Sequence, residues 1–129
     1  MGVEFSPGER LQHDRAAALG RDMSAPVRVT YFFGLESPGS YPDATEEALS
    51  AMGIAEVTVD EEISGDGWWH VAAFTTLRLT PETIRESEQQ MMRLAVATDV
   101  RYHGWHVTLN VAERRQLATR RPDLATEAD

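Results

Sequence analysis

Four segments of the chain alternate apolar and polar positions with the two-residue period of a half-buried β-strand. Between Val27 and Phe33, for example, every odd-numbered position is apolar. Successive strand side chains point to opposite faces, so these positions share one side of a sheet. The strands predicted on this basis are residues 27–33, 54–61, 68–77 and 101–109.

The segments before and after the first predicted strand carry sequence signals for the start and end of a helix. Ser6-Pro7-Gly8-Glu9 is a capping-box pattern with proline at the first helical position, and Gly20 is a natural stop. These signals predict a helix over residues 5–20. Asp43 followed by Glu46 predicts the start of a second helix, which ends at Gly53.

Two more helices are predicted in the second half of the chain. Thr80-Pro81-Glu82 begins the longest one, with a cap, a proline at the first position and an acid where the helix dipole favours it. Asn110 with Glu113 caps a short final helix that stops near Pro122. The apolar stripe of the long helix comprises Ile84, Met91, Leu94, Ala95 and Thr98.

The predicted order is strand, helix, strand, strand, helix, strand, with one further helix at each end. Right-handed crossovers turn this order into an α+β fold, the ferredoxin-like split βαβ sandwich. It has a four-stranded antiparallel sheet with two helices on one face, plus short N- and C-terminal helices. We expect residues 1–26 to form a helical extension and linker, 27–110 the ferredoxin-like domain, and 111–129 a C-terminal helix and frayed tail.

The sheet face opposite the two helices is predicted to carry an apolar patch of Phe32, Trp68 and Phe74. Such a patch usually marks an interface, a ligand groove or a covering segment. Three interpretations remain open: the terminal helices fold back over it, a second copy packs on it, or a different protein docks there.

A glycine-tryptophan strand opening occurs twice, as Gly67-Trp68-Trp69-His70-Val71 and as Gly104-Trp105-His106-Val107. Alternation places Trp69 and Trp105 on the covered face, and His70 and His106 on the open one. We interpret the tryptophans as core anchors and Gly65-Asp66-Gly67 as hairpin-turn chemistry.

Charge is distributed unevenly along the chain, which has a net charge of -9 and no lysine or cysteine. No basic residue occurs between Arg28 and Arg78, whereas nine acids do. Such an acidic stretch repels phosphate and makes direct nucleic-acid binding a poor hypothesis. It suits a basic protein partner better.

No apolar run is long enough for a membrane span, and a cytoplasmic location is expected.

Candidate chemistry is sparse. His70 and His106 are expected on strands separated by the first strand, about 10 Å apart across the sheet. That distance is too long for one metal without further ligands. No nucleophile elbow or phosphate-binding glycine loop is present. We therefore predict neither a metal nor a cofactor, and expect a binding protein in preference to an enzyme.

From Val27 to Leu109 the chain resembles the regulator of ribonuclease E activity B (RraB) family. The resemblance is carried by the motifs Tyr31-Phe32-Phe33, Gly65-Asp66-Gly67-Trp68 and His103-Gly104-Trp105. In the family an acid follows the second Gly-Trp; here His106 takes that place. The resemblance implies a non-enzymatic acidic protein that binds and inhibits a ribonuclease E-type endonuclease.

Partner contacts are expected either on the acidic stretch or on the aromatic sheet face. These candidate residues are Glu56, Asp60, Glu61, Glu62, Asp66, Phe32 and Phe74. The alternative is a dimeric α/β-barrel enzyme or small-ligand-binding protein with its pocket between two sheets. Phe32, His70, Phe74 and His106 would line that pocket, with histidine as acid or base.

Overall fold

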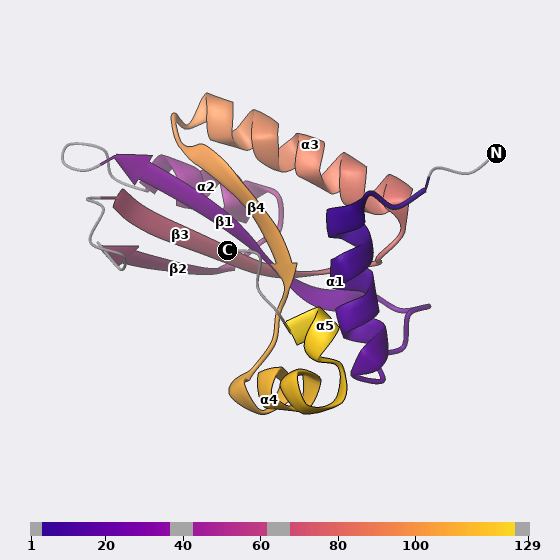
Figure 1. Cartoon of the computed structure of the whole chain (residues 1–129). Helices are drawn as coiled ribbons and strands as arrows, with labels where there is room; N and C mark the ends of the chain where they lie inside the picture. The colour runs from indigo at the N-terminus through magenta and orange to yellow at the C-terminus, as the bar shows by residue number, and fades with distance from the viewer. Residues whose placement is uncertain (1–3, 37–42, 62–67, 126–129) are drawn as a thin grey trace.

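The computed structural model describes residues 4–36, 43–61 and 68–125 as four strands and five helices (Figure 1). In chain order the elements are α1 (Pro7–Ala18), β1 (Val27–Glu36), α2 (Asp43–Ala51), β2 (Glu56–Glu61), β3 (Trp68–Leu77), α3 (Pro81–Ala97), β4 (Arg101–Val107), α4 (Val111–Arg120) and α5 (Pro122–Ala125). The predicted mixture of helices with a four-stranded antiparallel sheet is confirmed.

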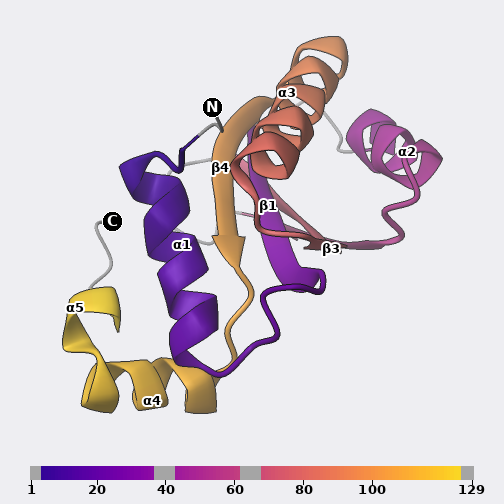
Figure 2. The same cartoon turned by 90° about the vertical axis from the view of Figure 1, so that its right-hand side faces the viewer.

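The strands form one sheet in the order β2-β3-β1-β4, and every neighbouring pair is antiparallel. The central pair is long, because β1 and β3 stay in register from Val27 opposite Leu77 to Glu36 opposite Trp68. Helices α2 and α3 cover one face of this sheet (Figure 2). Helix α1 flanks the β4 edge, and α4 and α5 lie on the side of the sheet away from α3.

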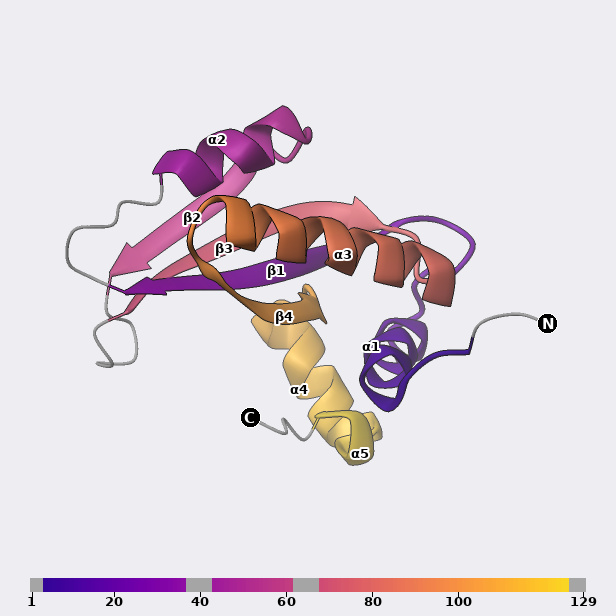
Figure 3. The same cartoon turned by 90° about the horizontal axis from the view of Figure 1, so that it is seen from above.

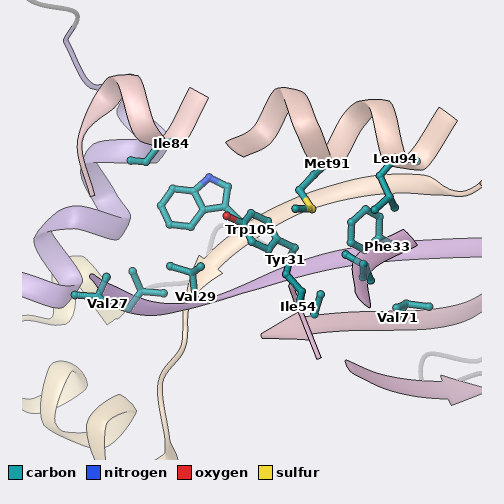
Figure 4. Close-up of a cluster of buried hydrophobic side chains, with 14 of the residues drawn as sticks. Val27, Val29, Tyr31, Phe33, Ile54, Val71, Ile84, Met91, Leu94 and Trp105 are labelled. Carbon is teal, nitrogen blue, oxygen red and sulfur yellow. The ribbon is translucent and has the colours of Figure 1, made fainter. Parts of the chain in front are cut away.

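The core lies between the sheet and α3, as Figure 4 shows. Val29, Tyr31 and Phe33 of β1 are almost fully buried, and Trp105 of β4 lies beneath the helix. From α3 the side chains that point into this layer are Ile84, Met91, Leu94 and Ala95. These four residues of the predicted stripe are therefore the buried face of α3, whereas the fifth, Thr98, is the C-cap that follows the helix. Burying a side chain of this size contributes about 1.5–3 kcal/mol of hydrophobic free energy.

Three predicted helix starts are confirmed together with their caps, while Asp43 is the first residue of α2. The Ser6 Oγ accepts from the Glu9 N–H, and the Glu9 carboxylate accepts from the Ser6 N–H at 2.7 Å. Asn110 and Glu113 form the same reciprocal pair at the start of α4. Thr80 caps α3 through its hydroxyl. Each cap satisfies N–H groups that the first helical turn leaves without an intrahelical partner.

Strand β4 departs from the predicted alternation. Phe32 pairs with Gly104 but the next residue, Phe33, pairs with Tyr102, so one extra residue forms a β-bulge at His103. Gly104 has a φ of 111°, a conformation that favours glycine. The bulge reverses the facing of the preceding residues and places Tyr102 on the same side as Trp105, where it packs against Phe33.

Several boundaries also differ from the predictions. β1 continues to Glu36, β2 begins at Glu56, and β4 ends at Val107. Ile54 precedes β2 but is still buried in the core. The segment after Pro122, predicted to fray, contains the short helix α5, which buries Leu124. The predicted turn Gly65-Asp66-Gly67 lies outside the described residues.

Candidate functional site

The open face of the sheet, opposite α2 and α3, brings together several predicted site residues. Strand register sets their order, because Thr30 pairs with Phe74 of β3 on one side and with His106 of β4 on the other. Phe32 follows two residues later on the same face of β1. Three of the four predicted pocket residues, Phe32, Phe74 and His106, therefore lie around Thr30.

The side chain of Trp68, the third residue of the predicted apolar patch, lies outside the described ones. Among the sheet side chains that the structure describes, Phe32 is the most exposed large apolar one, at 36%. Its ring meets the His106 ring edge-on, with centroids 5.4 Å apart and planes at 65°. This arrangement is favourable for aromatic pairs and orients both side chains. An exposed, oriented aromatic ring is a suitable contact for a partner or ligand.

Arg28 crosses the face beside Phe74. Its guanidinium carbon lies 5.3 Å from the centroid of the Phe74 ring, and its Nη2 donates to the Glu56 carboxylate. The cation therefore bridges β1 and β2 across β3. Both charges are largely exposed, so the pair contributes at most about 1 kcal/mol. Glu56, one of the predicted acidic contacts, thus already has an arginine partner.

A cleft of about 230 Å³ opens on this face where β1 and β4 approach α4. Its lining residues are Arg15, Thr30, Phe32, Phe74, His106, Val107, Thr108, Leu109 and Arg114. The Thr30 and Thr108 hydroxyls are 2.7 Å apart and hydrogen-bond across the two strands. The terminal helices thus bound the open face at one end and leave Phe32 exposed.

Residues of α1 fix this end of the molecule. Arg15 is only 2% exposed, and its Nε donates to the Leu124 carbonyl oxygen of α5 at 2.7 Å. Gln12 accepts from the Val107 N–H at the outer edge of β4, also through a buried hydrogen bond. Helix α1 therefore satisfies an edge-strand donor and ties the N-terminal and C-terminal segments together.

Sequence reasoning did not identify Arg15 or Arg114 as site residues. Both line the cleft because α1 and α4 lie at the same end of the sheet, although about 100 positions separate the two residues in the chain. A buried arginine also carries no local signal, because charged residues usually indicate a solvent-exposed helix face.

His70 does not line the cleft. It pairs with Gly34 of β1, whereas His106 pairs with Thr30, four residues away along the same strand. The two histidines are therefore about 13 Å apart along the strands and about 10 Å across them, or roughly 16 Å in total. The sequence-based distance counted only the separation across the strands.

The acidic candidates gather at the opposite edge of the sheet. Edge strand β2 contains Glu56, Asp60 and Glu61, and its backbone pairs Asp60 with His70 and Glu61 with Trp69. Helix α2 lies next to β2 and adds further acids without any basic residue in its last turn (Figure 3). Glu62 and Asp66 lie outside the described residues.

The described part of the chain contains neither a metal-ligand cluster nor a membrane-spanning helix. No group of three or more histidine, aspartate or glutamate side chains there is placed to hold a metal ion. None of the helices described is long and apolar enough to cross a membrane.

The chain matches a known protein family. The family model described as Regulator of ribonuclease activity B matches residues 12–107, from the middle of α1 to the end of β4. The match therefore includes all four strands and both helices that cover the sheet. No curated protein shows a significant match to the chain.

Proposed function

The chain belongs to the regulator of ribonuclease activity B family, and we propose that it acts by binding and inhibiting a ribonuclease E-type endonuclease. The family match carries this proposal, because its description is that of a ribonuclease regulator. In this proposal the chain is a binding protein, and its surface chemistry determines where the nuclease docks.

The acidic side formed by α2 and β2 is the docking surface that we favour. Between Arg28 and Arg78 the chain contains nine acids and no cation, and Asp43, Glu46 and Glu47 lie on α2 beside strand β2. An RNA-degrading enzyme needs basic segments to hold its substrate, because RNA binding depends on phosphate contacts. An acidic surface would attract such segments and compete with RNA for them.

We also propose that β1–β4 with α2 and α3 constitute a ferredoxin-like split βαβ sandwich. The element order between residues 27 and 107 and the packing of both helices on one face support this assignment. The arrangement leaves the opposite face of the sheet open. Phe32 and Phe74 on this face form the second surface available to a protein partner.

The docking surface can be tested by measuring the affinity of the whole chain for a purified ribonuclease E-type endonuclease. We expect Glu61→Arg with Glu62→Arg to weaken binding by about ten-fold or more near 0.15 M salt, since both charges change sign. Glu82→Arg with Glu86→Arg provides the matched control, because it makes the same charge change on exposed positions of α3.

The aromatic surface is tested in the same assay with Phe32→Ala and Phe74→Ala. Weakening by these variants, with full binding by the reversed Glu61 and Glu62, would move the docking surface to the open sheet face. Equal weakening by the α3 control would show that only net charge matters. Absence of binding by the unmodified chain would contradict the proposed function.

A further inference from the structure

We propose that strand β2 binds an extended basic segment of the ribonuclease, which pairs with it as a further strand of the sheet. This inference rests on the proposed function, because it specifies how the partner engages the acidic side of the molecule. Three features of β2 support it: its position at an edge, backbone groups without partners, and a charge that disfavours a second copy.

The two edges of the sheet differ in how they are covered. At the β4 edge, Gln12 of α1 accepts a hydrogen bond from the Val107 N–H. At the opposite edge, β2 pairs with β3 alone among the strands that the structure describes. An uncovered edge strand presents a row of backbone donors and acceptors to any extended chain. Strand β2 is therefore the edge at which a partner strand can be added.

The hydrogen-bond pattern identifies which backbone groups of β2 point outward. In antiparallel strands, successive residues direct their N–H and C=O groups to opposite sides. The Thr108 N–H donates to the Arg28 carbonyl at 2.9 Å, so Arg28 directs its groups to β4. Followed through the registers of β1, β3 and β2, this alternation directs Thr58 toward β3 and Val57 and Val59 outward. Within the described part of the chain, the outward groups of these two valines form no hydrogen bond.

The side chains of β2 hold the strand in place before a partner arrives. Val57 and Val59 are partly buried against the hydrophobic core, while Glu56 and Thr58 are exposed. The Glu56 carboxylate also accepts from Arg28 of β1. Because the strand is already extended and anchored, pairing costs it little conformational entropy.

The charge around this edge selects a basic partner in preference to a second copy. Strand β2 contains three acids and no basic residue, and α2 beside it contains three more acids and no basic residue (Figure 3). Two β2 strands paired about Thr58 would bring Glu56 of one copy opposite Asp60 of the other. Like charges directly opposite each other destabilise a strand pair, whereas an arginine or lysine in the partner strand forms a favourable one.

Amide hydrogen exchange tests the pairing residue by residue. The whole chain is placed in D₂O either alone or bound to a purified ribonuclease E-type endonuclease, and its amides are read by NMR after release. In the free chain, the Val57 and Val59 amides should exchange faster than the Thr58 amide, because only Thr58 is directed to β3. In the complex, exchange at Val57 and Val59 should slow by about ten-fold or more.

Val59→Pro and Val59→Ala form a matched pair of variants. Proline removes the outward N–H, and an edge strand tolerates it where that N–H forms no bond within the sheet. Alanine shortens the side chain but keeps the donor. We expect Val59→Pro to weaken endonuclease binding about ten-fold, since a hydrogen bond is lost and the ring obstructs the partner strand, and Val59→Ala to leave it within about two-fold. Thermal unfolding checks that both variants fold.

The possible failures are distinguishable. Unchanged exchange at Val57 and Val59 in a saturated complex, or equal weakening by the two folded variants, would overturn the strand pairing and leave the proposed inhibition standing. Slow exchange of both amides in the free chain that becomes faster on dilution would overturn it in favour of a second copy at this edge. Absence of any complex would overturn the strand pairing together with the proposed function.

Discussion

Two tyrosine hydroxyls link the sheet to helix α3, which covers it. The Tyr102 hydroxyl donates to Glu88 at 2.9 Å, and the Tyr31 hydroxyl hydrogen-bonds with Ser87. Burial raises the pKa of both phenols, and the Glu88 carboxylate raises the pKa of Tyr102 further. The folded state therefore favours neutral tyrosines.

Replacing Tyr102 with Phe should lower the free energy of unfolding by about 1.5–3 kcal/mol at pH 7, because a hydrogen bond to a charged group is lost. Because the pKa of Tyr102 is raised in the folded state, the stability contributed by the neutral phenol is fully present below the unfolded-state pKa of about 10. This contribution declines as the pH rises above that value, since the unfolded chain then loses the tyrosine proton more readily than the folded chain. Urea unfolding from pH 8 to 11 measures both effects. The variant should show a smaller alkaline decline, and an unchanged decline would contradict the assignment.

Gly104 offers a second test at the residue scale. A Cβ added there meets nothing within 4 Å, so any cost of Gly104→Ala arises from its positive φ alone. We expect a loss of about 1–2 kcal/mol. Gly8→Ala is the control, since Gly8 lies in α1 with open space and ordinary helical φ. It should be neutral or raise stability by up to about 1 kcal/mol. Thermal unfolding of both variants measures these changes in stability.

At the scale of the elements, helix α1 has a specific structural role, because it covers the outer edge of strand β4. The Gln12 side chain accepts a hydrogen bond from the Val107 N–H, which points outward from the edge strand. Gln12→Met keeps the bulk but leaves this buried donor without its acceptor. We expect it to lower the free energy of unfolding by about 1–3 kcal/mol and to speed hydrogen exchange at the Val107 amide.

Gln89→Met is the matched control, because Gln89 is an exposed position on α3. That substitution should change stability by less than about 0.5 kcal/mol. If both variants unfold alike and the Val107 amide exchanges at an unchanged rate, the hydrogen bond is not what holds α1 against β4.

Local signals predicted most elements, whereas long-range contacts were beyond the sequence. The caps at Ser6, Thr80 and Asn110 depend on residues three positions away, and all three are present in the structure. The sequence did not predict the bulge at His103. At a bulge, two residues of one strand lie opposite a single residue of the partner strand, and this breaks the alternation of side chains between the two faces. The Arg15 contact with Leu124 joins opposite ends of the chain, and periodicity contains no information about it.

The same limit applies to the candidate site. Alternation correctly placed Thr30, Phe32, Phe74 and His106 on one face, because strand side chains follow a fixed period. It could not set how far each strand is shifted along its neighbour, which is why His70 lies well away from His106. The cleft itself needs α4, whose position relative to the sheet depends on tertiary packing.

Across the whole molecule, charge of opposite sign collects at different places. The acidic residues of α2 and β2 lie at one edge of the sheet, while Arg114, Arg115 and Arg120 lie on α4 (Figure 3). Such a distribution orients an approaching charged partner as well as attracting it. Under the proposed function, a basic segment of the ribonuclease would therefore meet the α2–β2 side first.

The rate of RNA cleavage by a ribonuclease E-type endonuclease, titrated with this chain, tests the central claim most directly. We expect the unmodified chain to lower the rate saturably. The Glu61→Arg, Glu62→Arg variant should need about ten-fold higher concentrations for the same inhibition at about 0.15 M salt. A cleavage rate that stays constant up to a large molar excess of the folded chain would contradict its proposed role as an inhibitor.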